Sequence, residues 1–184
     1  MFFLQMSGFP GSGKSTLSRE IARRLDAVIV DHDVTKTALL ELTAQHSLDP
    51  ELAGRVAYDL DWALVEFHLS LGRNVILDSP CLYGVMIDRG LAMTANSGAT
   101  YRYVECLVDD VDEINRRLRE RERKLSQIRS VSPEDFYRTV TASKRPAHMH
   151  TLTIDTNRPL ETYLPDVIAY LQGIDRPPDA SCDF

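Results

Sequence analysis

Short apolar runs alternate with longer stretches of helical periodicity along this chain of 184 residues. Apolar runs at residues 2–6, 27–30, 74–78, 101–108 and 151–155 predict five strands. The first run is interrupted only by Gln5, as is typical of a strand buried on both faces. Because a helical stretch follows most of these runs, we expect a three-layer α/β fold with a five-stranded, mainly parallel sheet.

The helical stretches show apolar residues three or four positions apart. Residues 14–25 predict a helix directly after the first strand, and Asp33 is placed to cap the next helix. Further helices are expected at residues 84–97, 110–124 and 160–171, with a short one after Pro133. One long amphipathic helix is predicted between them by the apolar residues Leu52, Val56, Leu60, Ala63, Phe67 and Leu71.

The same pattern indicates how the chain is divided. Residues 1–172 predict a single domain, and the aperiodic residues 173–184 predict a loose tail. Around residues 120–133 the charged helix gives way to polar positions without periodicity. We expect this segment to form a mobile helical lid that orders when ligand binds.

A phosphate-binding motif lies between the first strand and the first helix. Residues 8–15 read GFPGSGKS, which matches the P-loop pattern in the structural context that the motif requires. Its glycines allow backbone N–H groups to turn inward around phosphate oxygens, and the helix that follows presents the positive end of its dipole. Lys14 is expected to contact the β- and γ-phosphates as a catalytic residue, and Ser15 to bind Mg²⁺. The expected nucleotide contacts here are Gly8, Pro10, Gly11, Ser12, Gly13, Lys14, Ser15 and Thr16.

Carboxylates follow two of the predicted strands. Asp31 and Asp33 lie at the end of the second strand, and Asp78 ends the third. On extended chain, residues two apart share a face, so both of the first pair are expected to point toward the ligand crevice. We predict Asp33 as the general base that also contacts the acceptor, with Asp31 as the alternative base, and Asp31 and Asp78 as metal-associated acids.

Positive charge is concentrated in one segment. Residues 116–129 carry seven Lys and Arg against two Glu, a local balance of +5 in a chain whose net charge is −6. Arg117 and Arg121 are four residues apart and therefore share a helix face. A guanidinium can stack on a base or neutralise transferring phosphoryl oxygens, which are the roles expected for these two residues.

These motifs together resemble the shikimate, gluconate and adenylate kinase branch of P-loop phosphotransferases, and also polynucleotide 5′-kinases. The matching segments are GFPGSGKST at 8–16, VDHD at 30–33, RLRER at 117–121, KRP at 144–146 and IDTNRP at 154–159. The resemblance implies a P-loop fold with Arg117 near adenine, catalytic Arg121 near phosphate, Arg145 at the acceptor, and Asn157 and Arg158 beside the adenine. The glycine triplet of shikimate kinases is absent, and Ser79, Pro80 and Cys81 stand near its place, which argues against shikimate as the acceptor.

The composition of the chain argues against some classes of binding partner. The negative net charge offers no general attraction to nucleic acid or anionic membranes, and no apolar run is long enough to cross a bilayer. Cys81, Cys106 and Cys182 are scattered singly, which indicates a reducing cytoplasm. His148 and His150, which precede the last strand, could reach the cleft but are more often structural or exposed.

The sequence therefore predicts an ATP- and Mg²⁺-dependent kinase that phosphorylates a hydroxyl of a small molecule, with ATP or another nucleoside triphosphate as donor. A polynucleotide 5′-hydroxyl kinase is the first alternative, although nucleic acid is the less favoured acceptor. A nucleotide-dependent switch or ATPase without kinase activity is the second.

Overall fold

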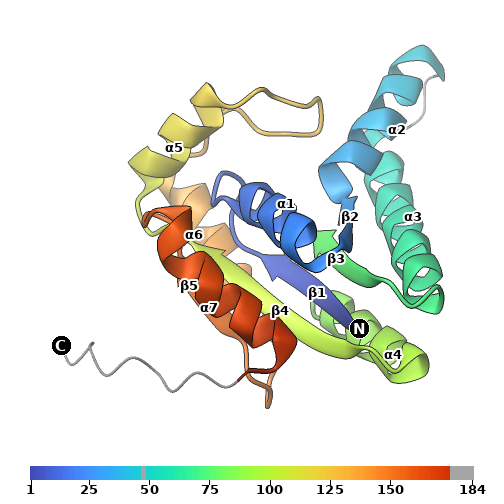
Figure 1. Cartoon of the computed structure of the whole chain (residues 1–184). Helices are drawn as coiled ribbons and strands as arrows, with labels where there is room; N and C mark the ends of the chain where they lie inside the picture. Colours follow the sequence, from blue (N-terminus) through green and yellow to red (C-terminus); the bar gives the residue numbers. More distant parts are fainter. Residues whose placement is uncertain (47–48, 175–184) are drawn as a thin grey trace.

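The computed structural model describes residues 1–46 and 49–174 (Figure 1). Its sheet contains the five strands β1 (Phe2–Ser7), β2 (Ala27–Asp31), β3 (Asn74–Asp78), β4 (Thr100–Leu107) and β5 (Leu152–Asp155). Its helices are α1 (Lys14–Leu25), α2 (His32–His46), α3 (Pro50–Ser70), α4 (Gly84–Ser97), α5 (Val111–Glu120), α6 (Pro133–Ala142) and α7 (Leu160–Gln172). The three-layer α/β fold with a five-stranded sheet is confirmed.

All the strand pairings are parallel, and the strand order is β2-β3-β1-β4-β5. The chain moves to one side of β1 for β2 and β3, then crosses to the other side for β4 and β5. This reversal of direction leaves a crevice beyond the carboxyl ends of the central strands, where α/β proteins of this kind hold their ligands.

Helices cover both faces of the sheet. On one face, α1 and α7 pack through Leu17, Ile21 and Val167 against β1 residues such as Leu4 and neighbouring strands. On the other face, α3 and α4 pack on the opposite side chains of the same strands, with Trp62, Val65 and Met86 in the core. All of β1 is buried, as the near-continuous apolar run in the sequence predicted for a strand covered on both faces. None of the described helices is long and apolar enough to cross a membrane.

The predicted apolar face of α3 does not point into the core. The helix exists, but it buries Ala53, Ala57, Trp62, Val65 and Leu69 instead. The large members of the predicted stripe are all exposed, by 37% to 59% of their surface: Leu52, Val56, Leu60, Phe67 and Leu71. The helix is apolar on two adjacent faces, and periodicity alone does not indicate which of them packs on the sheet.

Two further helix boundaries differ from the prediction. The cap of α2 is Asp31 rather than Asp33, because the helix already begins at His32 and the Asp31 Oδ1 accepts hydrogen bonds from the Asp33 and Val34 amides. The helix expected up to Lys124 ends at Glu120, where Arg121 adopts an extended conformation. Residues 121–132 are consequently irregular rather than helical.

The packing of α4 on β1 and β4 generates a stability prediction. A Cβ atom at Gly90 would lie 2.7 Å from the Tyr101 ring and 2.9 Å from the Phe3 ring, both in the core. We expect Gly90→Ala to reduce the free energy of unfolding by about 1–3 kcal/mol through overpacking. Urea denaturation measures this change. The matched control is Gly84→Ala, where nothing lies within 4 Å of the added atom, and a wild-type midpoint for Gly90→Ala would contradict the packing.

Candidate active site

The phosphate loop connects β1 to α1 in the conformation that the glycines make possible. Gly8, Gly11 and Gly13 have φ values of +128°, +91° and +86°, a region that L side chains rarely adopt. A Cβ atom at Gly8 would also lie 2.3 Å from the Cys106 carbonyl oxygen, so the loop crosses β4 too closely for any side chain. The loop ends at Gly13, the N-cap of α1, where the free amides and the positive end of the helix dipole attract an anion.

Lys14 is folded into this loop. Its Nζ donates hydrogen bonds to the Gly8 and Phe9 carbonyl oxygens at 2.9 Å and 3.1 Å, and the residue is only 8% exposed. Burial lowers the pKa of its ammonium group, while the nearby Asp78 acts in the opposite direction. The backbone carbonyls thus hold the ammonium group at the entrance to the phosphate nest.

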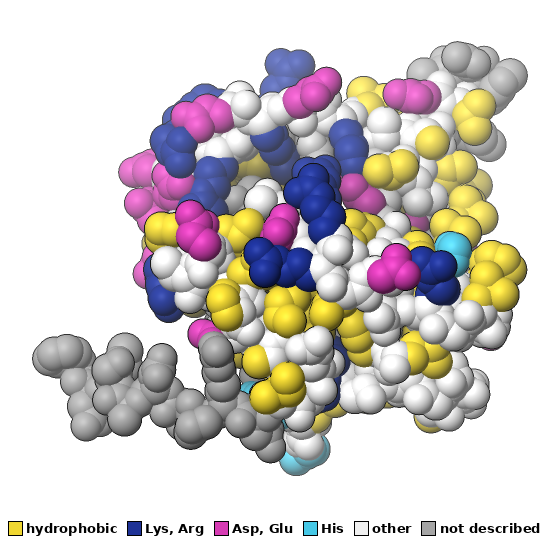
Figure 2. All heavy atoms as spheres, in the orientation of Figure 1, with side chains coloured by type: hydrophobic (Ala, Val, Ile, Leu, Met, Phe, Trp, Pro, Cys, Tyr) yellow, Lys and Arg dark blue, Asp and Glu magenta, His cyan; other side chains and the backbone are white. Residues whose placement is uncertain are grey.

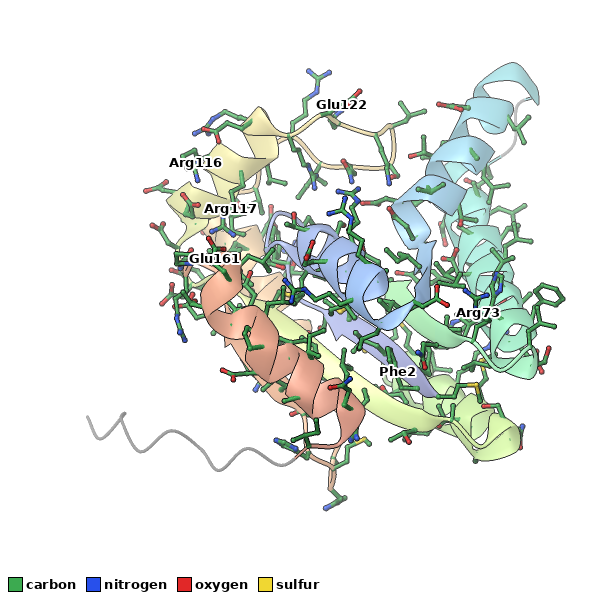
Figure 3. The ribbon with its side chains drawn as sticks, viewed as in Figure 1. Phe2, Arg73, Arg116, Arg117, Glu122 and Glu161 are labelled. Carbon is green, nitrogen blue, oxygen red and sulfur yellow. The ribbon has the colours of Figure 1, made fainter. Side chains whose placement is uncertain are left out.

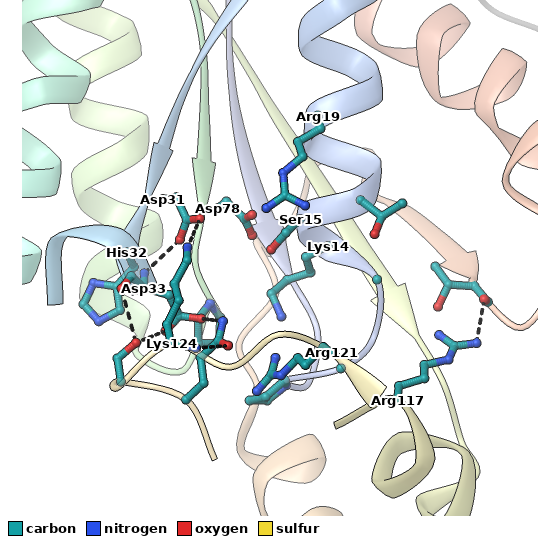
Figure 4. A pocket seen from close by; sticks show the side chains of 18 of the residues that line it. Lys14, Ser15, Arg19, Asp31, His32, Asp33, Asp78, Arg117, Arg121 and Lys124 are labelled. Carbon is teal, nitrogen blue, oxygen red and sulfur yellow. Dashed lines mark hydrogen bonds and ion pairs between the residues drawn. The ribbon is translucent and has the colours of Figure 1, made fainter. Parts of the chain in front are cut away.

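A large cavity of about 1170 Å³ opens beside the loop (Figure 4). This volume exceeds that of most pockets for one drug-sized ligand, so a nucleotide and a small second substrate can fit together. Figure 2 shows Lys and Arg side chains over α5, the following segment and α1, around the cavity. The cations that line it are Lys14, Arg19, Lys36, Arg117, Arg121, Arg123, Lys124 and Arg158, against the carboxylates of Asp31, Asp33, Asp78, Glu120 and Glu122.

Asp78 and Ser15 form the part of the site that fits a divalent cation. Asp78 lies opposite Asp31 in the β2–β3 register, it is 5% exposed, and its carboxylate lies beside the Ser15 side chain (Figure 4). Burial raises the pKa of its carboxyl group, whereas the charge of Lys14 lowers it. Across residues 1–46 and 49–174, no three His, Cys, Asp or Glu side chains gather into a metal cage. One hydroxyl and one carboxylate nevertheless suit Mg²⁺, which keeps several waters and completes its shell with substrate phosphates.

The segment after α5 crosses the cavity and contacts the Asp31–Asp33 pair. Asp31 accepts a hydrogen bond from the Lys124 Nζ at 2.7 Å. The two Asp33 carboxylate oxygens accept from the Ser126 hydroxyl at 3.0 Å and from the Gln127 Nε2 at 2.7 Å. Since the Asp31 Oδ1 also caps α2, Asp33 is the carboxylate of this pair without a capping role. Although Asp33 lies in the first helical turn rather than on extended chain, both carboxylates line the cavity.

At the opposite end of the cavity, Arg117 of α5 meets the loop after β5. The Arg117 guanidinium donates to the Thr156 carbonyl oxygen at 3.0 Å and to the Asn157 Oδ1 at 3.2 Å. Figure 3 shows Arg117 turned toward the start of α7, whereas Arg116 lies on the outer side of α5, where it pairs with Glu113 and Glu120. Arg158 also lines the cavity. The structure therefore brings two of the predicted adenine-side residues, Arg117 and Asn157, into contact, although Asn157 itself is not among the residues that line the cavity.

Arg121 extends from the end of α5 toward the phosphate loop (Figure 4). Its Nη2 donates to the Ile128 carbonyl oxygen, while its buried Nε has no hydrogen-bond partner within the described chain. Burial lowers the pKa of this guanidinium, and its charge in turn lowers the pKa of Lys14. An anion between Arg121 and Lys14 would relieve their mutual repulsion, which fits the expected phosphate role.

Not every predicted residue lies in the cavity. Arg145, predicted at the acceptor, pairs with the buried Glu105 of β4 and is not among the residues that line the cavity. His148 and His150 lie in the exposed turn before β5, also away from the cavity. Of the three cysteines, Cys81 and Cys106 are buried and unpaired, and Cys182 lies outside the described residues.

The structure also adds side chains that sequence reasoning did not select. His32 hydrogen-bonds through Nδ1 to the fully buried Asp61 at 2.7 Å, and its ring stacks on Tyr58 with centroids 3.9 Å apart. His32 and Tyr58 both line the cavity on the side of Asp33. The position of His32 between Asp31 and Asp33 could have marked it as a site residue. Its partners Asp61 and Tyr58 are revealed only by the packing of α3.

The chain is similar to a known protein family and to several solved structures. A family model described as an AAA domain matches residues 4–143. A search of curated proteins finds no match. Among solved structures, a protein provisionally designated a kinase from Chloroflexus aurantiacus is 19% identical, with 95% of this chain and 98% of that chain covered and a TM-score of 0.70.

Two other solved structures illustrate the range of similar proteins. Kti12 from Chaetomium thermophilum, in complex with ADP-AlF3, is 16% identical, with 95% and 100% of the two chains covered and a TM-score of 0.67. A gluconokinase from Sinorhizobium meliloti is 15% identical, with 94% and 93% covered and a TM-score of 0.61. At these identities the likeness concerns the fold, which is that of P-loop kinases and nucleotide-binding proteins. With three quarters of its length matched by the family model, the chain belongs to the AAA domain family.

Proposed function

We propose that the protein is an ATP- and Mg²⁺-dependent kinase that transfers the γ-phosphoryl group to a hydroxyl of a small molecule. The observation that carries the proposal is the shared cavity, which is lined by both the phosphate loop and the Asp33 carboxylate. A binding site for nucleotide alone would not need additional space beside a carboxylate such as Asp33. The gluconokinase among the similar structures supports the same reaction class.

Each group of cavity residues would have its own role in phosphoryl transfer. Lys14, Arg121 and the loop amides would hold the phosphates and neutralise charge as the bond from the bridging oxygen to the γ-phosphorus breaks. Asp33 would accept the proton of the acceptor hydroxyl. The oxygen of that hydroxyl would bond to the γ-phosphorus as the bond to the bridging oxygen breaks, and ADP would leave. Ser15 and Asp78, with Asp31 nearby, would hold Mg²⁺, which neutralises the β- and γ-oxygens when bound. Arg117, Asn157 and Arg158 would position the adenine.

The acceptor side favours a small molecule over a nucleic acid strand. Near Asp33 the cavity is walled by His32, Tyr58, Leu82 and Tyr83. Most cations of the cavity belong to α1, α5 and the segment after α5. These cations would contact the nucleotide rather than the acceptor. Outside residues 116–129 the chain has a balance of −11, whereas a strand-tracking protein needs cations along a groove.

The direct test is transfer from labelled ATP to a panel of sugars, sugar acids and polyols, beside a short 5′-hydroxyl oligonucleotide at two salt concentrations. We expect labelling of a small molecule. Oligonucleotide labelling that weakens steeply with salt would replace this proposal with a polynucleotide kinase, because phosphate contacts are salt-dependent. Rapid ATP hydrolysis that no acceptor alters would favour the switch or ATPase.

Lys14→Ala tests the phosphate site. We expect the affinity for an ATP analogue to fall about 10- to 100-fold, since a charged hydrogen-bond donor to phosphate is lost. Isothermal titration calorimetry measures the affinity, and thermal melting checks that the fold is retained. The matched control is Lys36→Ala, which removes another cavity cation from α2. Equal losses in both variants would show that only general charge matters.

Asp33→Asn tests the base. The amide keeps the side-chain shape but takes no proton, so we expect transfer to fall at least about 100-fold with nucleotide affinity nearly unchanged. The control is Asp31→Asn, which disturbs the α2 cap and the metal side of the site. If Asp33→Asn loses nucleotide affinity and keeps transfer, Asp33 belongs to the metal site and Asp31 becomes the candidate base.

A further inference from the structure

A continuous apolar stripe runs along the outward face of α3. In Figure 2, hydrophobic side chains gather at the right-hand edge of the molecule, where Figure 1 places this helix. The stripe continues over the whole length of α3, because its members follow each other at intervals of three or four residues. The exposed fractions of its large side chains are Leu52 42%, Val56 37%, Leu60 44%, Leu64 44%, Phe67 55% and Leu71 59%.

Neither the core nor the active site accounts for this stripe. The opposite faces of α3 already supply Trp62, Val65 and Leu69 to the core and Tyr58 to the cavity, and no stripe residue lines the cavity. The exposed parts of the six side chains form an apolar patch on the order of 500 Å², within the range at which patches on soluble proteins are commonly interaction sites.

The order of residues along the stripe suits a second copy of the same helix. Its members are spaced almost symmetrically about the middle of α3, near Asp61. An antiparallel copy, related by a twofold axis through that point, would therefore place equivalent apolar residues opposite each other. Ala63, exposed on the same face near the axis, would let the two helices approach closely. The opposed pairs would be Leu52 with Leu71, Val56 with Phe67, and Leu60 with Leu64.

Charges beside the stripe match the same arrangement. Arg55 and Glu66 lie along the same edge of the stripe, one before its midpoint and one after it. The twofold axis therefore brings Arg55 of each copy near Glu66 of the other. Both side chains are exposed, and neither forms an ion pair with another described residue. In contrast, the neighbouring Asp59 is already paired with Arg89 of its own chain. A parallel arrangement would bring like residues together instead.

We propose that the protein forms a twofold-symmetric dimer through antiparallel packing of α3 against α3 of a second copy. The two stripes would remove on the order of 1,000 Å² from water, near the lower limit for a stable interface, so the dimer should dissociate in the micromolar range. The active sites would lie away from the interface, and the dimer would not depend on nucleotide.

Sedimentation equilibrium of the full chain over about 1–100 µM tests the dimer, since mass action populates it within that range. We expect a monomer–dimer equilibrium without ligand. Leu60→Glu should weaken it at least about 100-fold, because two carboxylates would be buried at the centre. Val85→Glu is the matched control: Val85 on α4 is 68% exposed and lies outside the stripe, so its variant should dimerise like the wild type.

A charge swap tests the antiparallel register. Arg55→Glu should weaken the dimer about threefold to tenfold by facing Glu66 of the other copy, and Arg55→Glu combined with Glu66→Arg should restore wild-type association. Circular dichroism and ATP-analogue binding show that each variant is folded. A monomeric wild type at about 100 µM, a Leu60→Glu variant that still dimerises, or a double variant no better than Arg55→Glu would overturn the proposal.

Discussion

Gathering positive charge at one edge of a parallel sheet is the constraint on which the rest of this structure depends. Polyphosphate binding needs amides, an ammonium group and guanidinium groups within a few ångströms, and these groups repel each other without an anion. The protein holds Lys14 on two backbone carbonyls and places Asp78 nearby. The phosphate loop can do this because three glycines take positive φ where β1 turns into α1.

The carboxylates form the counterpart of that positive edge. Strand register places Asp31 beside Asp78, and the following helix turn places Asp33 beside the same cavity. Lys124, Ser126 and Gln127 cover this pair from the segment after α5. Because the segment hydrogen-bonds to both carboxylates, an acceptor that approaches Asp33 also meets Ser126 and Gln127. Access to the proposed base is thereby linked to the position of residues 121–132.

α3 connects the two aspects of the molecule. One of its faces carries Tyr58 and Asp61, which hold His32 beside the proposed base. The adjacent face carries the exposed stripe. A helix that is fixed to the sheet by Trp62 and Val65 can present both faces rigidly, so the acceptor wall and the proposed dimer surface share one support.

The sequence by itself determined the fold class, the strand positions and the phosphate loop. Those features depend on local signals: buried runs in β1 and β3, glycine positions, and a lysine and serine at fixed spacing. It also indicated that Asp31, Asp33 and Asp78 would gather, because the carboxyl ends of parallel strands share one edge. Arg117 and Arg121 were placed at the same site by their shared helix face and by the resemblance to P-loop kinases.

Only the tertiary structure decided the facing of α3, the cap of α2 and the partners of each carboxylate. Two adjacent faces of α3 are apolar, and contact with the sheet selects the one that carries Val65 over the one that carries Leu60. Asp31 rather than Asp33 caps α2 because the strand ends one residue before the helix begins. The His32–Asp61 pair and the place of Arg145 on Glu105 join residues 29 or more positions apart. Such contacts follow from packing between elements, which no local pattern along the chain encodes.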